Sequence, residues 1–366
     1  MMSKPIYFEN LAKSNLFFDK KLKEKFNVFL KKGKFILSDS VILFEKNFSK
    51  FIGTKFCVGV GNGLDALTIA FSALEIQKGS EVIVASNSYI ACIIAIKNSN
   101  LRPILVEPDV GTYNLDIRKI EKKITKKTKA ILAVHLYGKP CDMNALKKIC
   151  KKYKLFLIED CAQSHGASIN GQITGSFGDM GCFSFYPTKN LGGFGDGGAI
   201  TCNNQSLSNK LKKIRNYGSI KKYQNDILGV NSRLDEIQAT FLNIKLKYLN
   251  KINNHKIKLA ALYDKFLKND FIKPIKQKNI KDVFHIYNIR HNNRDKLKKY
   301  LESYNIQTDI HYKTPPYRQK CFKNDLKIEY PISDKIHATT LSLPISFSHS
   351  EEDILTVIKR MNSFKS

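Results

Sequence analysis

Between residues 51 and 200 the chain alternates short apolar runs with helical repeats, and this alternation constrains its fold more than any other feature. Seven runs read as strands: KFCVGV, EVIVAS, RPILVE, AILAVH, KLFLIED, CFSFY and AITC. The helical repeats among them are LDALTIAFSALE, YIACIIAIKNS and MNALKKICKKY. Strands separated by helices of about 10–15 residues predict crossover connections and a mainly parallel sheet with both faces covered.

The pattern changes after Asn203. Long helical repeats follow in residues 207–218 and 233–268, and beyond Phe271 short strands are mixed with helices. A chain of 366 residues is long enough for a large and a small domain. We therefore expect a large α/β domain in residues 1–250, including the N-terminal segment, and a smaller α+β domain in residues 251–366.

The composition of the chain indicates where the protein resides and whether its cysteines are oxidised. No apolar run approaches the ~20 residues that cross a bilayer, and the N-terminus lacks the apolar stretch of a signal peptide. We expect a cytoplasmic protein with no membrane partner. The eight cysteines contain no C-x-x-C pair, and no histidine cluster stands near them. They predict buried thiols, without a zinc site or a disulfide framework.

The formal net charge of +29 raises the question of nucleic-acid binding. Only eight of the 61 basic residues are arginine, although base and phosphate recognition relies on the planar arginine fork. The lysines are spread along the chain, mostly at helical spacing beside apolar positions, which is typical of solvated helix faces. We expect no nucleic-acid partner, although a basic field can help to recruit an anionic substrate.

The segment VGVGNGLDAL places Gly61-Asn62-Gly63 between a strand and a helix. Glycines there let the backbone turn its amide groups towards an anion, and the helix dipole adds favourable charge. The segment matches neither the dinucleotide fingerprint nor the Walker pattern. It is compatible with a phosphate site and equally with an ordinary connection in an α/β fold.

The strand KLFLIED ends in Glu159-Asp160, at the edge where open α/β sheets bind ligands. A carboxylate at that edge can hold a protonated ring nitrogen, as a pyridoxal cofactor requires. The alternative is a helix cap or a surface acid. Gln163 and His165 follow on the same loop, and a lone histidine is more often structural than functional.

Lys189 stands in the segment CFSFYPTKNLGGFGDGG, after a short strand and before a glycine-dense loop. A lysine that forms a Schiff base needs a fixed position, little water and a lowered pKa. Ser184, Tyr186 and Pro187 precede it. With 53 lysines in the chain, any one of them is a poor candidate by number alone, but the surroundings of Lys189 favour a catalytic role.

A fourth segment, GVNSRLDEIQA, carries Asn231 and Ser232 ahead of a long helical repeat. Both residue types are good helix caps, so the simplest interpretation is the start of a helix.

Together these motifs resemble the DegT/DnrJ/EryC1/StrS family of sugar aminotransferases. The resemblance runs from about Ile6 to the last helix and also includes EPDVGTYNLD, AVHLYGKPCDM and RNYGS, in the family's order. It implies a fold of the aspartate-aminotransferase type, pyridoxal 5′-phosphate as cofactor and a homodimer with active sites at the subunit interface. One departure is His255-Lys256, where the family often has two arginines; we expect this to concern helix surface or interface contacts.

The resemblance also implies residue roles. Lys189 would form the Schiff base, Asp160 would pair with the pyridine nitrogen and Gln163 would contact the 3-hydroxyl group. Tyr89, in NSYIA, would stack against the cofactor ring. The phosphate would be held by Gly63, Leu64 and Ser184, and by Asn231 of the partner subunit.

A narrower resemblance concerns the substrate. VGVGNGLDAL, VEPDVGTYNLD and IHYKTPPYRQ are similar to the subgroup that aminates C3 of dTDP-linked 3-keto-6-deoxyhexoses, with glutamate expected as amino donor. On this interpretation Tyr186, His311 and Tyr312 lie near the sugar or its diphosphate, although the last two are equally compatible with a packed strand. Weaker candidates for substrate contacts are Tyr217, Tyr223 and His165.

Other functions remain open at this point. One is a 4-aminotransferase acting on a UDP- or dTDP-linked 4-keto sugar. A pyridoxamine-dependent sugar dehydratase typically has histidine in place of the lysine, so Lys189 argues against it. The same fold also serves lyases and decarboxylases of amino acids, which need an arginine for the substrate carboxylate. From a different class comes a basic, non-enzymatic protein that binds polyanions.

Overall fold

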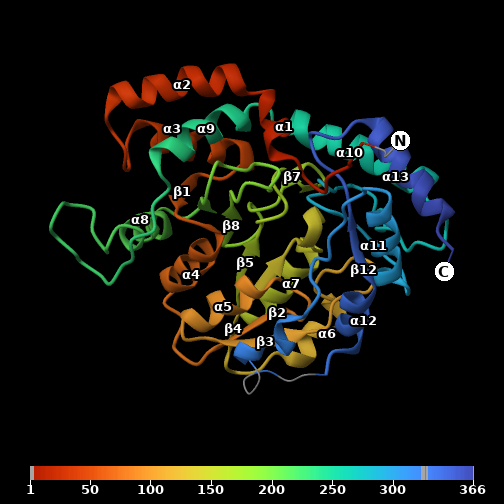
Figure 1. Cartoon of the computed structure of the whole chain (residues 1–366). Helices are drawn as coiled ribbons and strands as arrows, with labels where there is room; N and C mark the ends of the chain where they lie inside the picture. The colour runs from red at the N-terminus through yellow and green to blue at the C-terminus, as the bar shows by residue number, and fades with distance from the viewer. Residues whose placement is uncertain (1–3, 323–325, 327–328, 366) are drawn as a thin grey trace.

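A seven-stranded sheet forms the centre of the computed structural model, which describes residues 4–322, 326 and 329–365 (Figure 1). Its strands, in spatial order, are β1 Phe56–Val60, β9 Gly198–Cys202, β8 Met180–Ser184, β5 Phe156–Asp160, β4 Thr128–Val134, β2 Glu81–Ala85 and β3 Arg102–Val106. The five strands from β8 to β3 are mutually parallel, whereas β9 is antiparallel to both β8 and β1. The predicted mainly parallel α/β sheet is confirmed.

Both faces of the sheet are buried, as the continuous apolar strands require. Along β4, Leu132 packs into a core with α4 (Gly63–Ala73), α5 (Ile90–Asn98) and α8 (Gln205–Ile214). The next residue, Ala133, packs on the opposite face against α7 (Met143–Tyr153). This alternation follows from the two-residue repeat of a strand.

Apolar side chains of α3 (Asp39–Ile52) and α9 (Glu236–Leu246) share a core with β1, β8 and β9, and α2 (Asp19–Lys32) lies outside α9 (Figure 1). The short helix α1 is Leu11–Leu16, and α10 is Leu249–Phe266. The predicted helical repeat of residues 233–268 is therefore two helices, with a break at Lys247 and Tyr248. Among the residues described, no helix combines enough length and apolarity to cross a bilayer.

A second core lies in the last third of the chain and includes Ile6 from the N-terminal segment. There β11 pairs with β12 in antiparallel register, and α10, α11 and α13 contribute apolar side chains. A small sheet of β10, β6 and β7 packs, through Ile169 and Ile280, against the core on the α7 face of the large sheet. The bounds of these and the remaining elements are β6 Ser168–Ile169, β7 Gln172–Ile173, β10 Ile280–Lys281, β11 Tyr287–Arg290, β12 Thr340–Leu343, α6 Ile117–Ile120, α11 Arg294–Ser303, α12 Pro331–Thr339, α13 Glu351–Ser363, and the 3₁₀ turns η1 Glu121–Lys123, η2 Leu136–Gly138, η3 Pro316–Arg318 and η4 Lys320–Phe322. The division at residue 250 stays a prediction.

Glu159, near the end of β5, is fully buried and holds the following turn together. Its Oε1 accepts hydrogen bonds from the backbone N–H groups of Phe177 and Gly178, each at 2.8 Å. Its Oε2 accepts one from Gly175 N–H at 2.8 Å and lies 3.0 Å from His135 Nε2. Burial disfavours protonation of His135, but contacts with Cys141, Cys161 and Glu159 hold its pKa well above the usual value.

We expect Glu159→Ala to lower the free energy of unfolding by about 3–5 kcal/mol, because the change leaves the buried His135 ring and three buried backbone N–H donors without their acceptor. Chemical denaturation followed by circular dichroism measures this loss. Glu121→Ala, which removes an exposed ion pair with Lys152, is the control and should change stability little. Equal stability of the two variants would contradict the prediction.

Candidate active site

A cavity of about 550 Å³ opens at the carboxyl ends of β4, β5 and β8. This is the edge at which open α/β sheets bind ligands, and the volume lies within the roughly 300–1,000 Å³ typical of small-molecule sites. The first turns of α4 and α5 form another wall. Ten residues expected to serve the cofactor or the substrate line this cavity: Gly63, Leu64, Tyr89, Asp160, Gln163, Ser184, Tyr186, Lys189, His311 and Tyr312.

Lys189 lies on a tight turn after β8. Its backbone N–H donates to Tyr186 O at 2.9 Å. The turn needs glycine at residue 192, because a Cβ atom there would lie 2.1 Å from Pro187 O. Desolvation lowers the pKa of Lys189 to about 8, against the opposing attraction of Asp160. At pH 7 roughly a tenth of this amine is therefore unprotonated, far more than of an ordinary lysine, and able to act as a nucleophile or base.

Asp160 is the last residue of β5 and is almost completely buried. Its Oδ1 accepts a hydrogen bond from Ala162 N–H at 3.0 Å. Its Oδ2 lies 3.1 Å from Cys92 Sγ, which donates to it from α5. The carboxylate is thus fixed in orientation inside the cavity, where it can pair with a protonated nitrogen of a bound ring.

Gln163 connects two parts of the cavity wall. Its Oε1 accepts from Tyr137 N–H at 2.6 Å, and its Nε2 donates to Tyr312 Oη at 2.9 Å. The ring of Tyr312 lies 4.8 Å from the ring of Tyr89, at an interplanar angle of 31°. Aromatic rings and an amide therefore line the space beside Asp160, which suits a flat aromatic ligand.

The N-terminus of α4 forms one end of the cavity. Asn62 caps the helix by accepting from Asp65 N–H at 2.8 Å. Gly63 approaches Ser184 so closely that a Cβ atom at residue 63 would lie 2.6 Å from Ser184 Cβ. Helix N-termini offer free backbone N–H groups and a positive dipole end, so Gly63, Leu64 and Ser184 lie where a phosphate can be bound.

The residues expected to contact the sugar lie in the same cavity. Tyr186 is half exposed, and His311 and Tyr312 come from the loop after α11. His311 Nδ1 lies 3.0 Å from Ser342 Oγ, and its ring stacks on Phe8 at 5.6 Å. His311 and Tyr312 are not part of a packed strand, because the backbone forms turns there.

Four expected contacts lie outside this cavity in a single chain. Asn231, Tyr217 and Tyr223 are exposed on the segment between α8 and α9. Helix α9 begins only at Glu236, with Asp235 as its N-cap, and Asn231 instead forms a β-bridge with Asn216. The interpretation of Asn231 and Ser232 as caps of this helix is therefore wrong.

His165 is the fourth, and it is completely buried instead of lining the cavity. Its ring packs 5.6 Å from the ring of Phe183 and 5.8 Å from that of Phe185. Burial, and next the neighbouring Lys189, lower its pKa to about 3. His165 is a neutral core residue, so the geometry gives it no direct contact with a ligand in the cavity.

His285 lines the cavity but was not anticipated from the sequence. Its Nε2 lies 3.3 Å from Lys189 Nζ. Burial, and next Lys189, hold its pKa well below the usual value, so its imidazole is neutral. It stands just before β11, far along the chain from the other motifs, and a lone histidine beside apolar residues carries no sequence signal.

Comparisons with known proteins agree with this geometry. A model of the DegT/DnrJ/EryC1/StrS aminotransferase family matches residues 18–362. A dTDP-3-amino-3,6-dideoxy-alpha-D-galactopyranose transaminase of Aneurinibacillus thermoaerophilus is 48% identical, over 98% of this chain and 99% of that protein. A UDP-N-acetyl-3-dehydro-alpha-D-glucosamine 3-aminotransferase of Acidithiobacillus ferrooxidans is 40% identical, over 89% of each.

Solved structures give the same result. DesV of S. venezuelae, in complex with a ketimine intermediate, superposes with a TM-score of 0.96 at 35% identity, over 98% of each chain. NtdA of Bacillus subtilis, with the bound cofactor PMP, superposes with a TM-score of 0.92 at 29% identity, over 99% of this chain and 85% of that one. With its mainly parallel sheet, its Lys189–Asp160 cavity and these relatives, the chain belongs to the DegT/DnrJ/EryC1/StrS aminotransferase family.

Proposed function

We propose that this enzyme uses pyridoxal 5′-phosphate to transfer an amino group from glutamate to C3 of a dTDP-linked 3-keto-6-deoxyhexose. The observation that carries the proposal is Lys189, an amine with a pKa of about 8 in the same cavity as the buried carboxylate of Asp160. The names of the relatives that are 48% and 40% identical both describe amination at C3 of a nucleotide sugar. The product would be a 3-amino-3,6-dideoxyhexose for a surface glycan.

The residues of the cavity fit pyridoxal phosphate. Asp160 provides a fixed anion for the ring nitrogen, and Gln163 provides an amide for the 3-hydroxyl group. Tyr89 offers an aromatic face. The N-terminus of α4, where Gly63 packs closely against Ser184, lines the cavity and offers backbone donors for a phosphate.

In the proposed mechanism the side chains bind, orient and move protons. Bound pyridoxal phosphate supplies an electron sink for the carbanion that forms next to the reacting nitrogen. Lys189 takes a proton at Nζ from Cα of glutamate and, in the second half of the reaction, returns one to C3 of the sugar. The negative charge of Asp160 favours protonation of the group that it faces. His285, being neutral, can accept or donate a hydrogen bond at Lys189 without adding charge.

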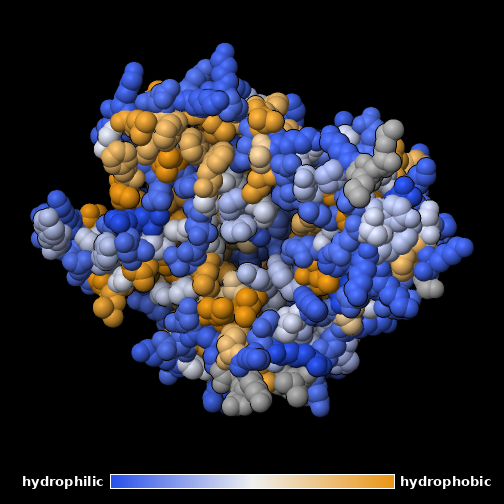
Figure 2. Space-filling view, in the orientation of Figure 1, coloured by the Kyte–Doolittle hydropathy of each residue, from blue (hydrophilic) through white to orange (hydrophobic). Residues whose placement is uncertain are grey.

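We propose further that the enzyme is a homodimer. Around α2 and α3 a band of exposed apolar side chains forms an orange area below α2 (Figure 2). Its exposed members include Phe26, Val28, Leu30, Phe35, Ile36, Ile42 and Leu43. A contiguous exposed apolar patch of this kind is typical of a protein–protein interface. In such a dimer we expect Asn231 of each subunit to reach the phosphate site of the other subunit.

A panel of keto sugars tests the proposed substrate. The purified enzyme, loaded with pyridoxal phosphate and glutamate, should aminate dTDP-3-keto-6-deoxyglucose or its galactose isomer, with kcat/KM at least tenfold above that for any 4-keto sugar. Mass spectrometry of the product measures amination, and the same sugars linked to UDP test the nucleotide. Preferred amination of a dTDP- or UDP-4-keto sugar would overturn the assignment to C3.

A further inference from the structure

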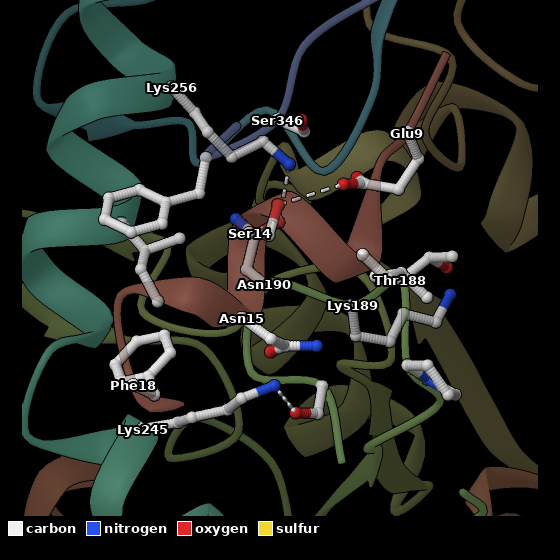
Figure 3. A pocket seen from close by; sticks show the side chains of 15 residues that line it. Glu9, Ser14, Asn15, Phe18, Thr188, Lys189, Asn190, Lys245, Lys256 and Ser346 are labelled. Carbon is white, nitrogen blue, oxygen red and sulfur yellow. Dashed lines mark hydrogen bonds between the residues drawn. The ribbon is translucent and has the colours of Figure 1, made fainter. Parts of the chain in front are cut away.

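A small pocket of about 50 Å³ lies behind the turn that carries Lys189 (Figure 3). Lys245 of α9 and Lys256 of α10 point into this pocket from one side, and the turn with Lys189 forms the other side. Lys256 is only 3% exposed. The expectation that His255-Lys256 concerns helix surface or interface contacts is therefore wrong for Lys256, because its side chain extends inwards to the active-site turn.

Lys256 holds the residue that follows Lys189 in the chain. Its Nζ donates to Asn190 Oδ1 at 2.9 Å. Asn190 Nδ2 in turn donates to Asn253 Oδ1 and to Val283 O, both at 2.9 Å. Both hydrogen-bonding groups of the Asn190 side chain are thus occupied, and the turn is tied to α10 and to the segment before β11.

Lys256 also holds the residue on the other side of the Lys189 amine. Its Nζ donates to the backbone carbonyl oxygen of His285 at 3.1 Å. The ring of the same histidine lies 3.3 Å from Lys189 Nζ. The Lys256 ammonium group therefore binds two residues that adjoin Lys189: Asn190, which follows it in the chain, and His285, whose ring lies beside its amine.

Charge adds to these contacts. Burial lowers the pKa of Lys256 to about 8, against the attraction of Glu9, and the positive charge of Lys189 lowers it further. The repulsion between two ammonium groups is mutual, so a charged Lys256 disfavours protonation of Lys189. The carboxylate of Glu9, in the N-terminal segment, lies across the pocket from α10 and faces the ammonium group of Lys256 (Figure 3).

We propose that Lys256 is a positioning residue of this aminotransferase: it fixes the Lys189 amine through Asn190 and His285, and its positive charge disfavours protonation of that amine. The inference rests on the proposed function of Lys189. The other titratable groups that act on Lys189 or Lys256 are Asp160, His165, His285, His311, His349 and Glu9. Among the residues described, none of these groups forms a hydrogen bond with Asn190, so Lys256 alone combines both effects.

The test measures Lys189 directly in the cofactor-free protein. Acetic anhydride labels neutral amines, and mass spectrometry of the Lys189 peptide gives the labelling rate between pH 6 and 10. In Lys256→Met we expect labelling at pH 7.5 to fall roughly fivefold or more, because a neighbouring positive charge is lost. In Lys256→Arg the charge and the donors are kept, and labelling should recover towards the wild-type rate.

Lys245→Met is the matched control. Lys245 is also buried in this pocket with a pKa lowered to about 8 by burial, but its Nζ donates to Gly192 O at 2.8 Å and, within the described part of the chain, forms no hydrogen bond with Asn190 or His285. We expect its labelling profile to match the wild type. Circular dichroism checks folding, and Lys256→Gln, which keeps one donor without the charge, replaces the methionine variant if that variant does not fold.

Two results would overturn the proposal: an unchanged Lys189 profile in a folded Lys256 variant, or the same change in Lys245→Met. Labelling requires neither cofactor nor sugar. Failure of the proposed substrate in the sugar panel would therefore leave this test intact, and the two failures can be told apart.

Discussion

Replacing Lys189 with alanine is expected to lower amino transfer from glutamate by about 10⁴-fold and to abolish covalent attachment of pyridoxal phosphate. The change removes the amine that lies beside Asp160 and His285 and whose pKa of about 8 suits it to proton transfer near neutral pH. Absorption spectra with and without glutamate, together with a stopped assay of 2-oxoglutarate formation, measure both effects. The wild type should be yellow and bleach with glutamate, whereas the variant should hold no covalent chromophore.

Two further variants separate chemistry from charge. Lys189→Arg keeps the positive charge but offers a guanidinium group that stays protonated, so the loss of amino transfer should match that of the alanine variant. Lys46→Ala removes an exposed lysine of α3 and should leave the spectrum and rate unchanged. A yellow Lys189→Ala protein that bleaches with glutamate would show that another lysine attaches the cofactor.

The parts of the site that could be predicted lie next to one another in the chain or at the ends of strands. Asp160 ends β5, Gly63 and Lys189 follow β1 and β8 within a few residues, and parallel strands bring their carboxyl ends to one edge of the sheet. The sequence pattern therefore places all three at one edge before any contact is known. The same argument predicts the covered parallel sheet from its uninterrupted apolar strands.

The parts that could not be predicted depend on contacts between distant segments. His285 and Lys256 reach Lys189 and Asn190 from 96 and 66 residues away. Neither stands in a motif, because a buried lysine on a helix has the same spacing as one on a solvated face. His165 shows the converse, since it follows a cavity loop in sequence yet its ring turns into the aromatic core beside Phe183.

The direction of β9 in the sheet is another feature that the pattern of apolar residues could not predict. AITC reads as a buried strand, and its apolar residues fit a parallel or an antiparallel neighbour equally well. The chain returns from the glycine-rich loop without a crossover helix, which is why β9 runs antiparallel to β8. This return places the loop of Lys189 and Gly192 over the end of the sheet.

We expect Asp160→Asn to lower kcat/KM for both half-reactions by about 10²–10³-fold, the size of effect seen when one electrostatic contact to a reacting group is removed. The amide keeps the shape of the side chain and an acceptor for Ala162 N–H, but it no longer favours a protonated ring nitrogen. The cofactor should still attach to Lys189, so the variant should be yellow but slow. Single-turnover absorption kinetics with glutamate measure the loss.

The pKa of Lys189 shows whether Asp160→Asn slows the reaction through the cofactor's ring nitrogen or through a less reactive Lys189 amine. The carboxylate of Asp160 raises that pKa, so its removal should lower the pKa of Lys189 further below about 8 and make the amine more reactive to acetic anhydride at neutral pH. Slow amino transfer together with faster labelling therefore locates the defect at the ring nitrogen and not at Lys189. Asp179→Asn is the matched control: its carboxylate accepts from Leu157 N–H at 2.8 Å, at the other end of β5, away from the cavity. If Asp179→Asn slowed the reaction as much as Asp160→Asn does, the loss would come from disturbed strand packing, and the assigned role of Asp160 would be wrong.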